Sequence, residues 1–435
     1  MANRNIRPYW CCLCRKPFLF CLSFATVLVL PYLFFWGYAG KPVVNHVLLK
    51  EKIFSVIENQ GPPSRKHEDE APSIVEPPFL DQNGPADEKL ERCHPNNVLL
   101  KVFMYDLPPE FHFGLLGWNG GGKSVWPDIR TKIPNYPGGL NLQHSIEYWL
   151  TLDLLSSRFP DRSGPCSVVR VEDSREADVV FVPFFSSLSY NRHSKIKAHQ
   201  RVSTNKLLQQ KLVRFLTSQR EWRRSGGRDH IIMAHHPNSM LDARTKLWPC
   251  IFILADFGRI AIGMQGGSIR QELFYLLRNE KDVHFSFGSV GANGINDASQ
   301  GMHSAKFCLN IAGDTPSSNR LFDAIASHCV PVIISDDIEL PYEDVLDYSE
   351  FSIFVRTSDA IKNGFLIKLI RGVSREAWTQ MWQRLKEVEG YFEFQYPSKE
   401  DDAVQMIWQA VARKVPAIRL KVHKSRRFSR FKIRK

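Results

Sequence analysis

A polar stretch in the last third of the chain, Asp314-Thr315-Pro316-Ser317-Ser318, carries side chains suited to an anion site. It follows an apolar run at residues 307–311 that predicts a buried strand, and it precedes a segment that predicts a helix over residues 318–328. Ser317 and Ser318 are N-cap residue types. Where a strand of an open parallel sheet leads into a helix, free backbone N–H groups and the helix dipole attract anions.

Two charged residues extend this prediction. Arg320 in the first helical turn supplies a forked donor that suits a phosphate, and Asp323 lies one turn further on the same face. Together they predict a site for a diphosphate-bearing ligand. The alternative interpretation is that the serines are ordinary helix caps and that Arg320 and Asp323 form a surface ion pair.

Other candidate catalytic groups stand at the ends of apolar runs in the first half of the chain. His235 and His236 follow one predicted strand, while Asp106 and Asp256 each end another. Histidine or a carboxylate can remove a proton from a hydroxyl near neutral pH. His235, Asp106 and Asp256 are therefore candidate bases, and a structural role for each is the alternative. The two adjacent histidines point to opposite faces of an extended segment, so they are not expected to share a metal.

Acidic and glycine-rich motifs give weaker signals. The chain has no Asp-x-Asp pair to hold a divalent cation, and the acidic run at residues 336–339 predicts a capped turn. Residues 117–124 match the phosphate-loop pattern G-x-x-x-x-G-K-[ST], but a strand does not lead directly into them and Pro127 follows. A glycine-rich loop is therefore preferred over a nucleotide-hydrolysing one. The glycines at residues 288–294 lack dinucleotide-binding spacing.

The elements that must position these groups alternate between strands and helices. Apolar runs predict strands at residues 98–106, 167–171, 177–185, 230–234, 250–255, 283–287, 307–311, 330–334 and 351–355. Helical patterns lie at residues 140–156, 202–222, 268–278, 318–328, 375–389 and 401–413. This alternation is typical of doubly wound α/β sheets. Two such units in tandem predict a ligand cleft between them.

A family resemblance rests on spaced elements of the second unit: Asn319-Arg320-Leu321-Phe322-Asp323-Ala324, Val330-Pro331-Val332-Ile333, Leu340-Pro341 and Phe351-Ser352. These resemble the C-terminal signature of exostosin-like glycosyltransferases of family 47, most of all the plant branch that includes arabinan arabinosyltransferases. The resemblance covers about residues 98–414. It implies a GT-B fold, in which two Rossmann-like domains face a cleft.

The resemblance also implies the chemistry. It points to a Golgi enzyme that transfers a sugar, arabinose by preference, from a UDP-sugar to a cell-wall polysaccharide such as pectic arabinan, with inversion. Neither a cofactor nor a metal is expected. Ser317, Ser318, Asn319, Arg320 and Asp323 would hold the nucleotide-sugar, together with Arg270 of the motif Gly266-Gly267-x-x-Arg270. Homo-oligomers, or complexes with other Golgi glycosyltransferases, are a further expectation.

One departure from the family affects the expected activity. Relatives carry a few tens of additional residues between the strand that ends near Asp256 and the motif at Gly266, whereas here residues 257–259 lead almost directly into it. The missing part normally holds the linker and the first strand of the second domain. A membrane-anchored partner or scaffold without turnover is therefore the alternative function.

The N-terminal region predicts a membrane anchor. Residues 17–40 carry no charge and are long enough to cross a bilayer, and basic residues precede them. The predicted organisation is a cytoplasmic tail (1–16), a signal-anchor helix (17–40), a stem (41–96), an acceptor-side domain (97–259), a nucleotide-sugar-binding domain (260–413) and a basic tail (414–435). This is a type II Golgi membrane protein with a lumenal catalytic domain.

Charge and cysteine content complete the expectations. The formal net charge is +12, but residues 413–435 contribute eleven Lys/Arg and no acid, so a nucleic-acid-binding fold is not expected. The basic tail suits an acidic polysaccharide, lipid head groups or plain solvent. Cys308 and Cys329 are expected to be buried thiols on core elements, although one or two disulfides suit an oxidising lumen.

Overall fold

The computed structural model describes residues 98–120, 122, 124–138, 142, 144–162, 164–198, 200–236, 238–254, 265–285, 294–311, 318–336 and 338–429. Within this part of the chain, no helix has both the length and the apolarity needed to cross a membrane. The predicted anchor at residues 17–40 lies outside the described residues, and so do Asp256 and Ser317.

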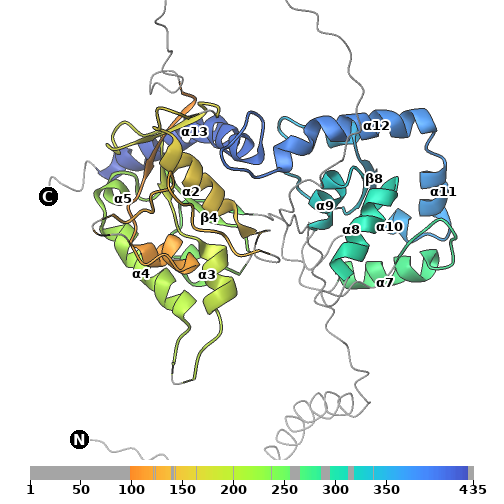
Figure 1. The fold of residues 1–435 in the computed structure, drawn as a ribbon, viewed down its shortest axis with the longest axis horizontal. Helices are drawn as coiled ribbons and strands as arrows, with labels where there is room; N and C mark the ends of the chain where they lie inside the picture. The colour runs from red at the N-terminus through yellow and green to blue at the C-terminus, as the bar shows by residue number, and fades with distance from the viewer. Residues whose placement is uncertain are drawn as a thin grey trace, which may run out of the picture. The chain divides into compact units, whose positions relative to one another are not determined.

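The first sheet has five parallel strands in the order β2-β1-β3-β4-β5 (Figure 1). The strands are β1 (Leu100–Met104), β2 (Val168–Val171), β3 (Val179–Val182), β4 (His230–Ala234) and β5 (Ile251–Leu254). Each lies within a run predicted from the sequence. All five carboxyl ends therefore face the same edge of the sheet, where ligands bind in open α/β sheets.

Helices cover both faces of this sheet, because successive strand residues point to opposite sides. On one face Val180 and Val182 pack into a core that α4 (Thr204–Ser218) completes. On the other face Val179 and Phe181 pack against α13 (Ala403–Ser429). The helices between these elements are α2 (Ile146–Ser156), α3 (Ser186–His193), α5 (Arg220–Ser225) and α6 (Leu241–Arg244).

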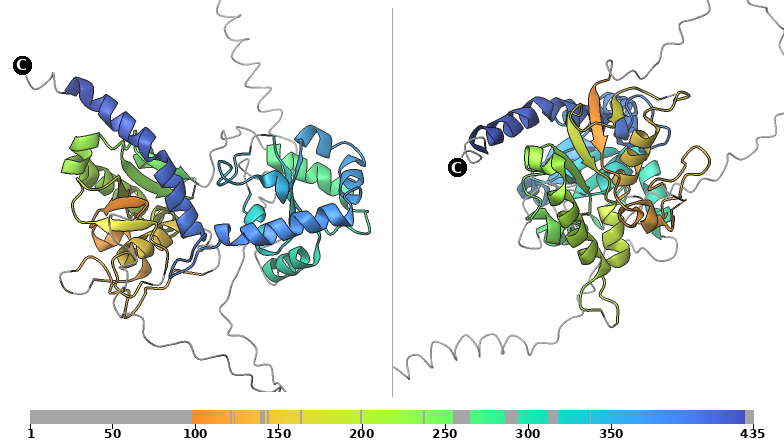
Figure 2. Two further views of the ribbon diagram at one scale, coloured as in Figure 1. Left: turned by 90° about the horizontal axis from the view of Figure 1, so that it is seen from above. Right: turned by 90° about the vertical axis from the view of Figure 1, so that its left-hand side faces the viewer.

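The helix α13 returns to the first sheet from the far end of the chain. It lies beside α2 and α5 (Figure 1, Figure 2). Its Trp408 is fully buried and donates its indole N–H to Asp153 Oδ2 on α2, at 3.0 Å. Asp153 also forms a buried ion pair with Arg162, at 2.9 Å. The predicted basic tail thus begins inside a helix: residues 414–429 continue α13, and Val415, Ile418 and Val422 belong to the core.

Trp408→Ala is expected to lower the free energy of unfolding by about 3–5 kcal/mol, because it opens a large cavity under the sheet. It also removes a donor from Asp153, a carboxylate whose pKa burial already raises to about 6. Urea denaturation would measure the loss. As a control on the same helix, Leu420→Ala removes a side chain that is 50% exposed and should change stability by less than about 0.5 kcal/mol. Equal losses in the two variants would refute the anchoring role of Trp408.

The second sheet has three parallel strands, in the order β6-β7-β8. They are β6 (Phe307–Ile311), β7 (Val330–Ile334) and β8 (Ile353–Val355). Its helices are α7 (Gln265–Leu277), α8 (Gly294–Ser304), α9 (Arg320–Ala326), α10 (Thr357–Ala360), α11 (Phe365–Arg371) and α12 (Arg375–Val388). Ile333 packs with residues of α9 and α12 on one face, while Val332 and Ile334 pack with α7 and α11 on the other. Both bodies therefore have the layered α/β architecture that the sequence predicts.

The described residues also include the short 3-10 helices η1 (Pro109–Phe111), η2 (Phe113–Leu116) and η4 (Tyr348–Glu350), and η5 (Glu389–Phe392), which continues α12. The strand predicted at residues 283–287 is not present in its described part, because residues 283–285 have no strand pairing. The predicted helix over residues 318–328 is α9, which is shorter. His328 adopts a left-handed backbone conformation, with φ of 53°, directly after it.

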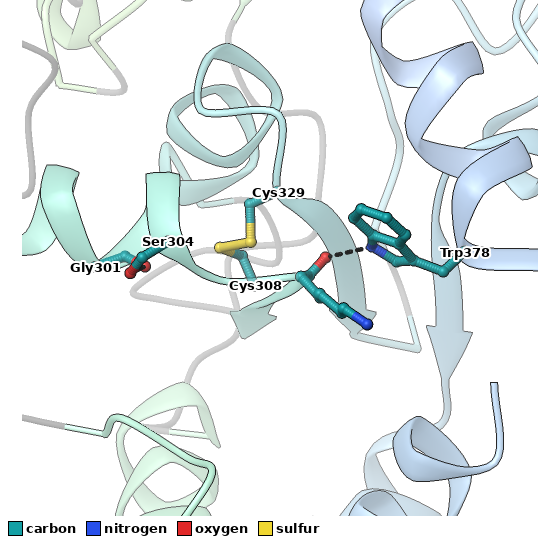
Figure 3. Close-up of a disulfide and its surroundings, with 6 residues drawn as sticks. Gly301, Ser304, Cys308, Cys329 and Trp378 are labelled. Atoms are coloured by element: carbon teal, nitrogen blue, oxygen red, sulfur yellow. Dashed lines mark hydrogen bonds between the residues drawn. A yellow bond between two sulfur atoms is a disulfide. The ribbon is translucent and has the colours of Figure 1, made fainter. Parts of the chain in front are cut away.

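The expectation of two buried thiols in the second body is wrong, because Cys308 and Cys329 form a disulfide (Figure 3). The register of β6 on β7 explains the pairing: Cys308 lies opposite Pro331, so the start of β7 comes within disulfide reach, with a Cα–Cα distance of 5.7 Å. Nearby, Trp378 of α12 donates its indole N–H to the carbonyl of Lys306, at 3.1 Å. Cys166 is also disulfide-bonded, and Cys250 is a buried free thiol.

Candidate functional site

The carboxyl edge of the first sheet gathers polar side chains from several segments. Asp106 follows β1, the serines at the start of α3 follow β3, and His235 and His236 follow β4. The segment that leads into α2 adds His144. Parallel strands bring these segments together at one edge, although they are far apart in sequence.

His235, a predicted base, forms a close pair with His144. Their Nδ1 atoms are 2.6 Å apart, so one ring donates its N–H and the other accepts. Burial, together with the neighbouring His236, lowers the pKa of His235 to about 4. The imidazole is therefore neutral at pH 7. If His235 donates from Nδ1, its Nε2 carries the lone pair that a base requires.

Glu147 is connected to this histidine cluster through hydrogen bonds. Its side chain is almost fully buried, and Oε1 accepts hydrogen bonds from the Ser187 backbone N–H (3.2 Å) and hydroxyl (2.8 Å). The Ser187 hydroxyl in turn accepts from the backbone N–H of His236, at 3.1 Å. Glu147 thus fixes both the start of α3 and the histidine segment. Glu147 and His144 are site residues that sequence reasoning missed.

Burial raises the pKa of Glu147 to about 7, from a model-compound value of 4.5. Between these two pH values the folded protein holds a proton that the unfolded chain has released, so stability falls as pH rises from about 4.5 to 7. Glu147→Gln keeps an acceptor oxygen and removes the titration. Between pH 4.5 and pH 8, the free energy of unfolding of the variant should therefore rise by about 3 kcal/mol relative to that of wild type.

Urea denaturation at both pH values would measure this difference. Glu172→Gln serves as the control, because this glutamate forms only a surface ion pair with Arg158. Parallel pH dependences for wild type and Glu147→Gln would show that Glu147 titrates normally.

Asp106, a second predicted base, lies at the same edge but in a different environment. Its carboxylate accepts hydrogen bonds from the indole N–H of Trp126 and from Arg170, each at 2.6 Å, and its side chain is 59% exposed. In the described part of the chain, no hydrogen bond joins Asp106 to His235. The structure therefore brings His235 and His144 together and leaves Asp106 in an ion pair.

The predicted anion site of the second body lies at the carboxyl end of β6. Arg270 on α7 donates from Nη2 to the carbonyl oxygen of Ile311, the last residue of that strand, at 3.2 Å. Further along the sequence come Ser318, Asn319 and Arg320, after residues 312–317, which lie outside the described residues. Arg270 thus contacts this strand end directly, while Arg320 contacts Ser318 at the start of α9.

Local geometry at α9 differs in detail from the prediction. The helix begins at Arg320 with Asn319 as its N-cap residue, and Asn319 makes no side-chain capping bond. The Ser318 hydroxyl accepts two long bonds from Arg320, one from the backbone N–H at 3.4 Å and one from Nη1 at 3.5 Å. Asp323 lies one turn after Arg320, as predicted. The two arginines, rather than a serine cap, are the main feature of this site.

The acidic run at residues 336–339 has a structural role. Asp336 accepts a hydrogen bond from the Thr357 backbone N–H at the start of α10, at 3.1 Å, which fits the predicted capped turn. The glycine-rich stretch at residues 117–124 follows the 3-10 helix η2 rather than a strand. Among the residues that the structure describes, no group of three or more His, Cys, Asp or Glu side chains could hold a metal ion.

One known protein family matches more than half of this chain. A model described as the exostosin GT47 domain matches residues 96–263 and 258–370. The chain belongs to the exostosin GT47 family. The two matched segments of this GT47 chain meet at residues 258–263, where the sequence predicts a missing segment.

Several plant GT47 proteins are similar to this chain. A probable arabinosyltransferase of Arabidopsis thaliana, ARAD1, is 36% identical over 387 residues, which cover 78% of this chain and 84% of that protein. The probable glucuronosyltransferase GUT1 of Oryza sativa subsp. japonica is 32% identical over 26% of this chain and 27% of its own length. The Arabidopsis probable beta-1,4-xylosyltransferase IRX10 is 32% identical over 26% of this chain and 28% of its own length.

Proposed function

We propose that this protein is a Golgi membrane glycosyltransferase that transfers arabinose from a UDP-sugar to a cell-wall polysaccharide such as pectic arabinan. The similarity to ARAD1 carries the proposal, because it extends over 84% of a protein named a probable arabinosyltransferase. The disulfide between Cys308 and Cys329 supports a lumenal location, since disulfides persist in oxidising compartments. The two parallel α/β sheets fit a GT-B type of fold.

In the proposed reaction, His235 is the general base. Its Nε2 takes the proton of the acceptor hydroxyl while the hydroxyl oxygen attacks the anomeric carbon of the donor sugar. The bond from that carbon to the diphosphate breaks on the opposite face, which gives inversion. His144 accepts the Nδ1–H of His235 and holds the ring in the tautomer that the transfer needs.

The second body would hold the donor. Arg320 and Arg270 neutralise the negative charge that grows on the leaving diphosphate, and forked guanidinium donors suit that role. Asp323 would accept a hydrogen bond from a ribose hydroxyl. No metal takes part in this proposal, and the acceptor polysaccharide would lie at the carboxyl edge of the first sheet.

A transfer assay tests the proposal directly. The full chain in detergent would be incubated with arabino-oligosaccharides and a panel of UDP-sugars, with and without EDTA, and the products analysed by mass spectrometry. We expect one pentose to be added from UDP-arabinose at an EDTA-independent rate. Transfer of a different sugar would overturn the donor assignment.

The alternative function is a scaffold that no longer catalyses sugar transfer. The division of the family match at residues 258–263 favours it, because the segment expected there links the two domains in relatives. Calorimetry with UDP-arabinose separates the two functions. A chain that binds no nucleotide-sugar would be a scaffold, whereas binding with turnover identifies the enzyme.

A further inference from the structure

A cavity of about 550 Å³ opens in the first body, and none of its lining residues belongs to the cluster around the candidate base. Its walls come from η1, from the start of the glycine-rich loop and from the facing ends of α3 and α4. Figure 1 shows α3 and α4 side by side in the first body. The volume falls within the range of about 300–1,000 Å³ that is typical of small-molecule sites.

The side chains around this cavity combine an aromatic ring with uncharged polar groups. Trp118, which is partly buried, and Leu115 supply apolar surface, while Asn119 and Thr204 supply an amide and a hydroxyl. The Nδ1 atom of His193 is buried and has no hydrogen-bond partner among the described residues. The rest of the His193 side chain is partly exposed and lines the cavity.

The described residues around the cavity favour an uncharged ligand. Among them Glu110 is the one carboxylate, and it is paired with Lys211 at 3.0 Å. None of these described residues is an arginine or a lysine. An apolar ring face beside amide, hydroxyl and imidazole groups matches a neutral sugar, which has C–H groups on its faces and hydroxyls at its edges.

The helix α3 connects the cavity with the proposed reaction site. The helix α3 begins at Ser186 and Ser187, which contact Glu147, and it ends at His193. From Ser187 to His193 the helix rises about 9 Å. That separation is comparable to the length of a short oligosaccharide, so an acceptor chain that reacts at His235 could extend toward the cavity.

We infer that the cavity lined by Trp118, Asn119 and His193 is a subsite for a neutral sugar of the acceptor, several ångströms from the residue that is glycosylated. This inference rests on the proposed function and adds a preference for long acceptors. The glycine-rich loop gains a role as well. Gly117 and Gly120 flank Trp118 and Asn119 and adopt left-handed conformations, with φ of 88° and 85°, which glycine adopts without strain.

Trp118→Ala tests the subsite through its dependence on acceptor length. For arabinotetraose, KM should rise about 10-fold, whereas kcat and the KM values for arabinobiose and UDP-arabinose should stay within twofold of wild type. Trp248→Ala is the matched control, because that indole is 74% exposed and does not line the cavity. His193→Ala should repeat the pattern if Trp118→Ala folds poorly. An equal change for both acceptors, or no change, would overturn the inference.

A binding measurement separates this inference from the proposed function. Tryptophan fluorescence of the full chain would be titrated with arabinotetraose and with trigalacturonic acid, in the absence of donor. Arabinotetraose alone should bind, and Trp118→Ala should weaken it about 10-fold. If wild type transfers no sugar but shows this binding, the subsite stands and the proposed activity fails. Absence of binding would refute the subsite.

Discussion

Arg320→Ala is expected to reduce kcat for sugar transfer by at least about 10³-fold, the largest effect that we predict for one substitution. An arginine that meets the charge of a leaving diphosphate stabilises the transition state more than the ground state, so its loss lowers kcat. Arg320 is the first residue of α9, and Arg270 contacts the end of β6, the strand that precedes α9 in the second sheet. Initial rates of UDP release with saturating acceptor would measure the effect.

Two further variants make this prediction specific. Arg320→Lys keeps the positive charge but loses the forked pair of N–H donors, so its rate should lie between those of Arg320→Ala and wild type. Arg375→Ala removes an exposed arginine at the start of α12 and should turn over like wild type. Wild-type turnover in a folded Arg320→Ala variant would refute a diphosphate site at α9.

His235→Ala is expected to lower kcat/KM by about 10²–10⁴-fold, the range for loss of a general base. Because the pKa of His235 is lowered to about 4, the base stays neutral from pH 8 to about pH 5. The wild-type rate should therefore be flat across this range and fall as pH approaches 4. His423→Ala removes an exposed histidine of α13 and provides the control.

His144→Ala separates positioning from catalysis. Without the partner at 2.6 Å, the His235 ring loses the contact that fixes its tautomer, so the rate should fall while the remaining activity still depends on His235. The double variant would then be no slower than His235→Ala alone. Multiplicative losses would show that the two histidines act independently.

Sequence patterns predicted most of the framework that carries these residues. β4, β6 and β7 have the bounds expected from their apolar runs, because buried parallel strands are short, continuous and rich in Val and Ile. The predicted ends of the helices were less accurate than those of the strands. The segment at residues 202–222 divides into α4 and α5 at Gln219, whose extended backbone ends the first helix.

The candidate site was only partly predictable, because its contacts join distant segments. His144 and His235 are 91 positions apart, and nothing in either local sequence indicates the partner. Glu147 lies in the first turn of an apolar helix, a position where an acidic residue is common for its effect on the helix dipole. The Cys308–Cys329 bond depends on the register of β6 on β7, which periodicity alone does not specify.

The packing of α13 has a consequence for synthesis of the protein. The first sheet is complete in sequence at Leu254, but the helix that covers one of its faces begins only at Ala403. At about 5–20 residues per second, the ribosome needs roughly 7–30 seconds to make the intervening segment. During that time the apolar face formed by Leu100, Val102 and Phe181 lacks its cover. The nascent chain should therefore depend on chaperones until its C-terminal helix emerges, and a premature stop before Trp408 should leave an aggregation-prone product.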